Sequence, residues 1–272
     1  MVRQPADEAT RTEKAHSLIL QSYDGGLFLG PIQEYYGHSD FANWGYWTQS
    51  TKSQKEACEA LMEKLLALIP KKKGSILDIA CGTGATTRYL TKYYAPENIT
   101  GINISEKQIQ RAKVNAPGCK FLVMDATRLL FQADCFDAVI CVEAAFHFCT
   151  RKRFLSEVHR VLSPGGYLVL SDILFRPGAE DLAPMLHIQN WVASPAAYGE
   201  LLRHVGFQQV RVIDATEECW RRFDRYNFNY VLKKLQSRQI DWKTFEIFMA
   251  RRAEKKAAVT YYALACGRKG LR

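Results

Sequence analysis

The chain has 272 residues, of which 47% are hydrophobic, and it carries a formal net charge of +9. This length and hydrophobic content suit one large α/β domain with a real core, and they exclude wholesale disorder. No run of about 18 apolar residues occurs, so we expect no membrane span. The polar N-terminus lacks the apolar stretch of a secretory signal, and we therefore expect an intracellular, cytoplasmic protein.

The cysteines and the charge indicate which metals and partners to expect. The eight cysteines are scattered, and none has the C-x-x-C spacing of a zinc site, so we expect mostly buried, reduced thiols and no metal. The positive charge gathers in residues 221–256, which hold eleven Lys or Arg against four Asp or Glu. We interpret this segment as a solvated helical face, with an anionic partner as the alternative.

Apolar periodicity predicts strands that alternate with helices along the chain. The expected helices cover residues 12–22, 54–68, 86–94, 106–115, 151–161, 196–205 and the basic region 219–257. A turn is expected at 23–26, after the first helix. The expected strands cover residues 76–80, 99–104, 119–123, 136–142, 167–171, 208–213 and 259–266. Such alternation is typical of a parallel sheet, whose ligands bind at the carboxyl ends of the strands.

A glycine-rich turn follows the first expected strand. Asp78 interrupts the apolar run 76–80, and Gly82 and Gly84 precede a helical pattern. Glycine lets the backbone adopt unusual dihedrals and approach a ligand closely. Thr87 stands where a dinucleotide fingerprint needs its third glycine, and no P-loop Gly-Lys-Ser/Thr follows. The turn resembles motif I, roughly D-x-x-C-G-x-G, of the class I S-adenosylmethionine (SAM)-dependent methyltransferases.

Three further segments match the same family. Residues 41–47 read F-A-N-W-G-Y-W, residues 162–166 read L-S-P-G-G, and residues 198–207 carry a tyrosine-to-Gly-Phe pattern before the sixth strand. The resemblance covers about residues 35–215 and the last strand. Small-molecule members, such as natural-product sugar O-methyltransferases and tocopherol methyltransferases, are the most similar.

The resemblance implies a fold and a domain organisation. The fold is α/β: a Rossmann-like, doubly wound, seven-stranded and mostly parallel sheet with helices on both faces and an antiparallel last strand. Residues 1–50 would form an N-terminal helical and aromatic lid segment. Residues 51–272 would form the methyltransferase domain, with helical cap insertions at about 173–195 and 217–257.

The same resemblance implies that SAM is the cofactor, with S-adenosylhomocysteine (SAH) as its product. Asp78 would meet the methionine ammonium, and Asp125 the adenine amino group. Asn103 stands where the family has an acidic residue for the ribose hydroxyls, and an amide makes no charge-assisted bond there. The expected cofactor-binding residues are Asp78, Ala80, Cys81, Gly82, Gly84, Asn103, Ile104, Gln108, Asp125, Ala126, Glu143, Tyr36 and Trp44.

His147 is the candidate general base, since methyl transfer to a hydroxyl requires removal of a proton. Asp172, at the end of the fifth strand, would orient it. Some relatives carry two adjacent histidines, whereas here the first position is Phe146. Alternatively, His147 only shapes the pocket and Asp172 only ends a strand. Glu143 would be the acid or cation-binding group if the acceptor is an amine or a carbon nucleophile.

We expect the methyl acceptor to be a small, largely apolar metabolite or natural product, methylated on oxygen. The residues expected to bind it are Phe146, Met185, Trp191 and Tyr226. Methylation of carbon or nitrogen in a small molecule is the alternative. A methyltransferase of RNA or protein, or a SAM-binding protein without catalysis, is the remaining choice. No nucleic-acid partner is expected, and the sequence does not specify the oligomeric state.

Overall fold

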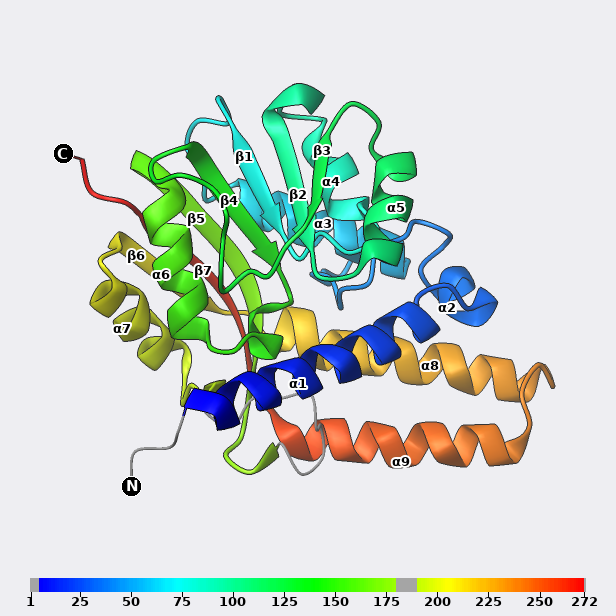
Figure 1. Cartoon of the computed structure of the whole chain (residues 1–272). Helices are drawn as coiled ribbons and strands as arrows, with labels where there is room; N and C mark the ends of the chain where they lie inside the picture. The colour runs from blue at the N-terminus through cyan, green and yellow to red at the C-terminus, as the bar shows by residue number, and fades with distance from the viewer. Residues whose placement is uncertain (1–4, 180–189, 272) are drawn as a thin grey trace.

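The computed structural model describes residues 5–179 and 190–271, apart from the side chains of 5–12, 14 and 15. Its centre is a seven-stranded sheet with strand order β3-β2-β1-β4-β5-β7-β6 (Figure 1). The strands are β1 (Ile76–Ile79), β2 (Ile99–Asn103), β3 (Lys120–Val123), β4 (Phe136–Val142), β5 (Leu162–Phe175), β6 (Gln208–Asp214) and β7 (Val259–Arg268).

Six strands point in the same direction, and β7 is antiparallel to both of its neighbours, β5 and β6. The four residues of β1 are all buried because helices cover both faces of the sheet. The predicted doubly wound sheet with an antiparallel last strand is therefore confirmed. Its order reverses between β1 and β4, and ligands bind at such a reversal, beyond the carboxyl ends of the strands.

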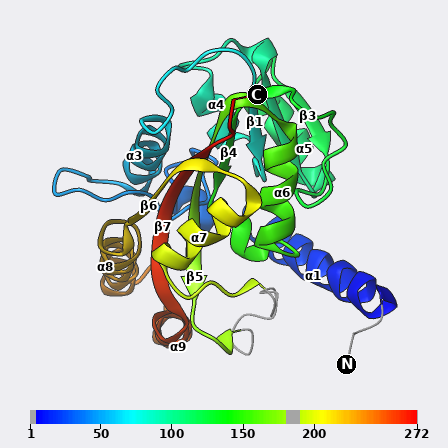
Figure 2. The same ribbon diagram turned by 90° about the vertical axis from the view of Figure 1, so that its left-hand side faces the viewer.

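Helices on the two faces bury two separate apolar cores. On one face pack α3 (Gln54–Leu66), α4 (Ala85–Leu90) and the start of α8 (Arg222–Gln236), and α5 (Glu106–Asn115) lies beside β2 and β3. On the other face pack α6 (Arg151–Val161) and α7 (Pro195–Val205), as Figure 2 shows. The helices α8 and α9 (Trp242–Ala258) form a hairpin that extends past the sheet.

The helix α1 (Pro5–Gly26) crosses the molecule below the carboxyl ends of the strands (Figure 1). A short α2 (Gly30–Tyr35) follows it. The expected turn at residues 23–26 was wrong, because the helix continues to Gly26. Tyr23 and Asp24 hydrogen-bond to distant parts of the chain, and these contacts outweigh the local turn preference of the two glycines.

Most other predicted elements are confirmed, with several corrections of length. The helix expected at 86–94 ends at Leu90, and the helix expected at 12–22 begins at Pro5. The strand expected at 167–171 is β5, which begins at Leu162, because Leu162 already pairs with Phe136 and the glycines form an irregularity in the strand. The helical region 219–257 is two helices, preceded by a π-helical turn, η5 (Thr216–Arg221). Six of the eight cysteines are buried.

The domain boundary at residue 50 stays a prediction. The side chains of Phe41 and Trp47 are buried in the same core as α3, so the aromatic segment is packed into the fold. Within the described residues, no helix is long and apolar enough to cross a membrane.

Candidate active site

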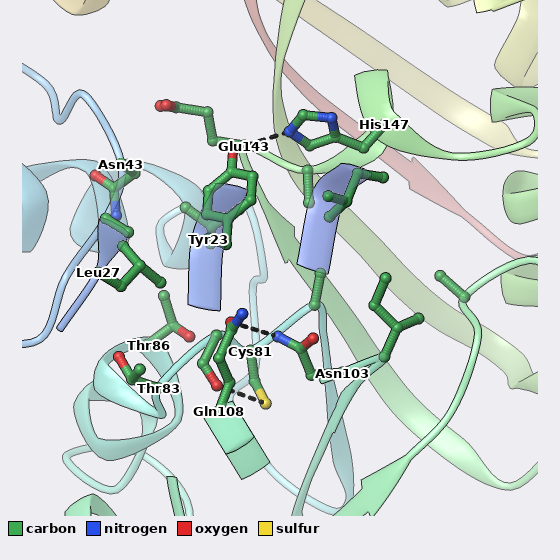
Figure 3. A pocket seen from close by; sticks show the side chains of 18 of the residues that line it. Tyr23, Leu27, Asn43, Cys81, Thr83, Thr86, Asn103, Gln108, Glu143 and His147 are labelled. Atoms are coloured by element: carbon green, nitrogen blue, oxygen red, sulfur yellow. Dashed lines mark hydrogen bonds between the residues drawn. The ribbon is translucent and has the colours of Figure 1, made fainter. Parts of the chain in front are cut away.

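A pocket opens at the carboxyl edge of the sheet, beneath α1 (Figure 3). The empty space in and above it is about 1050 Å³, a volume that includes the part open to solvent. The wall residues come from α1, the segment 40–43, the glycine turn and the ends of β2, β3 and β4. They are His16, Ile19, Leu20, Tyr23, Leu27, Asp40, Phe41, Ala42, Asn43, Ala80, Cys81, Gly82, Thr83, Ala85, Thr86, Asn103, Ile104, Gln108, Met124, Asp125, Ala126, Val142, Glu143, Ala144, His147 and Phe148.

The two glycines of the turn have different roles. Both have positive φ, +55° at Gly82 and +86° at Gly84. A Cβ on Gly82 would meet nothing closer than Gln108 Oε1 at 3.9 Å, so it would enter the pocket. A Cβ on Gly84 would lie 2.8 Å from Ala112 Cα, so this glycine allows α4 to approach α5. Gly82 therefore leaves room for a ligand, and Gly84 is required for packing.

Asp78 is 1% exposed and lies directly behind the turn. The hydroxyls of Thr86 and Thr87 both donate to its Oδ2 at 2.7 Å. Its Oδ1 is buried without a hydrogen-bond partner among the described residues. Burial raises the pKa of this carboxyl to about 6, although the two threonine hydrogen bonds oppose the shift. Asp78 itself is not in the pocket wall, but Thr86, which donates to it, is. A buried carboxylate with an open acceptor behind the wall fits a cationic group such as the ammonium of SAM.

The end of β2 carries a network of polar side chains. Asn103 Nδ2 donates to Gln108 Oε1 at 3.1 Å, and Asn103 Oδ1 accepts from the Ser105 backbone N–H at 3.0 Å. Asp24 of α1 joins this network, because Ser105 Oγ and Gln108 Nε2 both donate to its carboxylate at 2.7 Å. Asn103 and Gln108 thus line the pocket as expected, with a carboxylate from a distant helix behind them.

At the end of β3, Asp125 and Ala126 lie in the wall together with Ile104 of the β2 loop. Asp125 Oδ1 accepts from the backbone N–H and hydroxyl of Thr127, and Oδ2 lies 3.7 Å from His16 Nε2. The expected adenine-side residues are therefore brought together, and His16 of α1 is added to them.

His147 lies in η2 (Ala145–His147), which follows β4, and it is 7% exposed. The hydroxyl oxygen of Tyr23 lies 2.8 Å from its Nε2 (Figure 3). Burial, and then the charge of Glu143, raise the pKa of Tyr23 well above its usual value, so the phenol stays protonated. The pocket therefore holds an imidazole nitrogen and a neutral hydroxyl at hydrogen-bond distance.

Glu143 is half-buried in the same wall, at positive φ (54°), at the end of β4. Its Oε2 accepts from the Trp44 backbone N–H at 2.9 Å and from the Tyr262 hydroxyl at 2.8 Å. Desolvation raises the pKa of this carboxyl to about 8, against the effect of those two hydrogen bonds. Glu143 can therefore exchange a proton near neutral pH.

Asp172 is not placed as the sequence predicted. It is fully buried and outside the pocket wall, and its Oδ2 pairs with Arg151 Nε at 2.6 Å. Arg151 also donates to the carbonyl oxygens of Ile173 and Asn190. A carboxylate buried without a partner would be costly, so a charge on α6 compensates the one on β5. The contacts of Asp172 are those of a structural ion pair and not of a partner that orients His147.

Several other expected residues lie behind the wall or away from it. Trp44 stacks on Phe223 with ring centroids 5.2 Å apart, and Tyr36 packs in the same core. The ring of Phe146 contacts those of His147 and Phe175, whereas Tyr226 packs on Trp47. Trp191 is 52% exposed. Met185 lies outside the described residues.

The sequence predicted a lid in residues 1–50 but not which side chains of α1, or of the segment before Trp44, line the pocket. α1 supplies Tyr23 and Leu27 to the wall, and Asp40 and Asn43 also line it. The available signal was the aromatic F-A-N-W-G-Y-W segment, which directly follows Asp40. Within the described residues, no group of three or more His, Cys, Asp or Glu could hold a metal ion.

Comparison with known proteins identifies a domain within the chain. Residues 77–170 match the model of a family described as a methyltransferase domain. These residues include the glycine turn and the ends of the strands that form the pocket floor. This part of the chain is therefore a SAM-dependent methyltransferase domain.

Several similar proteins are named as methyltransferases of small molecules. A phthiotriol/phenolphthiotriol dimycocerosates methyltransferase of Mycobacterium ulcerans is 36% identical over 50% of this chain, and the match spans 46% of that protein. The erythromycin 3''-O-methyltransferase of Saccharopolyspora erythraea is 27% identical over 78% of this chain and 74% of its own length. The chain is thus similar to small-molecule methyltransferases. Its match to the mycobacterial protein spans about half the length of that protein.

Solved structures share the fold. The [4+2]-cyclase SpnF superposes with a TM-score of 0.72 at 19% identity, covering 95% of this chain and 97% of its own. The geranyl diphosphate C-methyltransferase of Streptomyces coelicolor A3(2), solved with Mg²⁺, geranyl diphosphate and SAH, gives 0.68 at 13% identity, covering 94% and 97%. The SAH in that structure agrees with SAM as the cofactor of this domain. The residues of this chain that would hold SAM lie in the glycine turn and at the ends of β1 to β4.

Proposed function

We propose that the protein transfers the methyl group of SAM to a hydroxyl of a small, largely apolar metabolite or natural product, with His147 as the general base. The observation that carries this proposal is the contact between His147 Nε2 and the Tyr23 hydroxyl at 2.8 Å inside the pocket. This contact is an oxygen-to-imidazole hydrogen bond of the length that proton transfer requires. If the hydroxyl of an acceptor took the place of the Tyr23 hydroxyl, it would face His147 Nε2 in the same way.

The relatives support the choice of oxygen. Two of the similar proteins are named as O-methyltransferases: the erythromycin enzyme, and O-methyltransferase cnsE of Penicillium expansum, which is 29% identical over 64% of this chain. The apolar part of the wall, formed by Ile19, Leu20 and Leu27 of α1, suits an acceptor with a hydrocarbon surface.

When bound, SAM supplies an activated methyl group on a sulfonium sulfur. The chain contributes three effects. Asp78 and the glycine turn would orient the cofactor, α1 would cover the pocket and exclude water, and His147 Nε2 would accept the proton of the acceptor hydroxyl as that oxygen takes up the methyl group. The released proton would stay on the imidazole.

One observation favours a second candidate, methyl transfer to carbon or nitrogen. Glu143 lies in the same pocket, and its pKa, raised to about 8, makes it a base of suitable strength. If the acceptor is an amine or an activated carbon, Glu143 would bind the cation or accept the proton, and His147 would shape the pocket.

The experiment compares wild type with His147→Gln and Glu143→Gln on a panel of apolar alcohols, phenols, amines and alkenes, with SAH formation as the readout. If His147 is the base, methylation of an alcohol or phenol falls by about a hundredfold in His147→Gln. Binding of SAH, measured by calorimetry, stays close to that of wild type.

Two results would contradict this assignment. If only amines or alkenes are methylated, and Glu143→Gln alone abolishes turnover, the second candidate holds. If SAH binds but no acceptor class in the panel is methylated, a SAM-binding protein without this catalysis is the better description.

A further inference from the structure

The carboxylate of Asp24 stands behind the polar wall at the end of β2. Its two oxygens lie 2.7 and 2.9 Å from Ser105 Oγ, and the Gln108 side chain donates to Oδ1 at 2.7 Å. Lys107 Nζ also donates to the backbone carbonyl of Asp24 at 2.8 Å. These contacts join α1 to the first turn of α5, over 80 residues away in the sequence.

This carboxylate determines how the Gln108 side chain is oriented. A carboxylate accepts hydrogen bonds only, so it holds the Nε2 amide group and turns the carbonyl Oε1 the other way. Oε1 then accepts from Asn103 Nδ2 at 3.1 Å and faces the open space at Gly82, 3.9 Å from where a Cβ would stand. A carboxylate at one end also polarises the amide chain, which strengthens its acceptor oxygens.

The wall at this point therefore presents acceptors to the pocket. Asn103 and Gln108 are both buried, at 8% and 5% exposed, and both line the cavity. Carbonyl oxygens of this kind bind hydroxyl groups, and the hydroxyl-rich part of the cofactor is its ribose.

We propose that Asp24 is a specificity-determining residue of the cofactor site: from α1 it holds the Gln108 carboxamide so that the carbonyl oxygen accepts a hydrogen bond from a ribose hydroxyl of SAM. Asp24 is a positioning residue, since it acts through Gln108. The inference rests on the cofactor site alone and is independent of the methyl acceptor. It also makes the docking of α1 and the binding of cofactor mutually dependent.

The test measures SAH affinity by calorimetry in wild type, Asp24→Asn and the control Glu13→Gln, which removes an exposed charge from the same helix. The second ligand is an SAH analogue that lacks both ribose hydroxyls. We expect Asp24→Asn to weaken SAH binding about tenfold and to leave the analogue almost unaffected, because only SAH uses the oriented acceptor. Glu13→Gln is expected to bind both ligands as wild type does.

A charge exchange makes the test sharper. In Asp24→Asn/Gln108→Glu the carboxylate moves onto Gln108 and the amide onto α1, so their hydrogen bond is kept and SAH affinity returns to within about threefold of wild type. Gln108→Glu alone places two carboxylates together, and we expect it to weaken SAH binding.

Three results would overturn the proposal. The first is an Asp24→Asn variant with wild-type affinity for SAH. The second is an equal loss for SAH and for the analogue, which would mean that Asp24 only anchors the helix. The third is a double variant no better than Asp24→Asn. Each of these differs from failure of the proposed methyl transfer, because no acceptor is present.

Discussion

At the scale of single residues, substitution of the two glycines of the turn should affect different properties: SAH affinity at Gly82 and stability at Gly84. Gly82→Ala puts a methyl group into the pocket, and we expect SAH affinity to fall at least tenfold with a stability loss of about 1–2 kcal/mol for the left-handed backbone. Gly84→Ala drives its Cβ against Ala112 of α5, and we expect a stability loss of about 2–4 kcal/mol. Urea unfolding and SAH titration of both variants separate the two effects. A larger stability loss in Gly82→Ala than in Gly84→Ala would contradict this assignment of roles.

Glu143 gives a pH-dependent prediction. Its pKa is raised from 4.5 to about 8, so the folded protein holds this proton more tightly than the unfolded chain. The stability that it contributes is therefore complete below about pH 4.5 and is lost as the pH rises through about 8. Glu143→Gln has no such proton to lose. In thermal unfolding without ligand, we expect the melting temperature of Glu143→Gln minus that of wild type to increase as the pH rises from 5 to 9. A difference that is the same at every pH would refute the raised pKa.

The residues of the site that sequence reasoning found are those with a local signal. Gly82 follows a short apolar strand, and Asn103 and Asp125 end the next two, so the α/β pattern alone places them at one edge. Tyr23 and Asp24 had no such signal, since they precede two glycines and fit a turn. Their roles depend on contacts with His147 and Ser105, which only the tertiary structure brings close.

At the scale of elements, the ion pair between Arg151 of α6 and Asp172 of β5 joins a helix to the sheet. Both side chains are at most 5% exposed. We expect Asp172→Asn or Arg151→Met to reduce the free energy of unfolding by about 3–5 kcal/mol, because each leaves a buried charge alone. The double variant should cost less than the two singles added together. The exposed pair of Glu200 and Arg203, 2.7 Å apart on α7, is the control, and Arg203→Met should change stability by less than about 0.5 kcal/mol.

The same variants distinguish a structural role from a catalytic one. If Asp172 oriented His147, Asp172→Asn would shift the pH profile of methyl transfer. With its carboxylate bound to Arg151, we expect the pH profile to keep its midpoint while stability falls. The sequence predicted Asp172 at the end of a strand, whereas β5 continues to Phe175. Its partner Arg151 is 21 residues away on a helix, and nothing in the sequence indicates that Arg151 is buried. The role of this carboxylate could therefore not be predicted before its partner was known.

At the scale of the whole molecule, the fold was predictable because each element has its own periodicity and the family motifs fall in a regular order. The function is less constrained by the fold. SpnF shares this architecture at a TM-score of 0.72 and is named as a [4+2]-cyclase. A shared fold therefore does not determine the reaction. In this chain part of the pocket wall comes from α1, whose site residues the sequence patterns did not identify.

The helix α1 covers the pocket. α1 is held over the pocket by polar contacts at three points: His16 to Asp125, Tyr23 to His147, and Asp24 to Ser105 and Gln108. Between them, its apolar side chains face the cavity. A ligand beneath the helix replaces this open space with contacts, so binding should stabilise α1 against local opening.

Hydrogen–deuterium exchange with and without SAH measures this effect. With saturating SAH we expect the amides of residues 16–26 to exchange at least tenfold more slowly, together with those of the glycine turn. The amides of α7, on the far face of the sheet, serve as the internal reference and should change little. Protection of the glycine turn without protection of 16–26 would mean that α1 does not close over the cofactor. The acceptor would then reach His147 past a cover that cofactor binding leaves free to move.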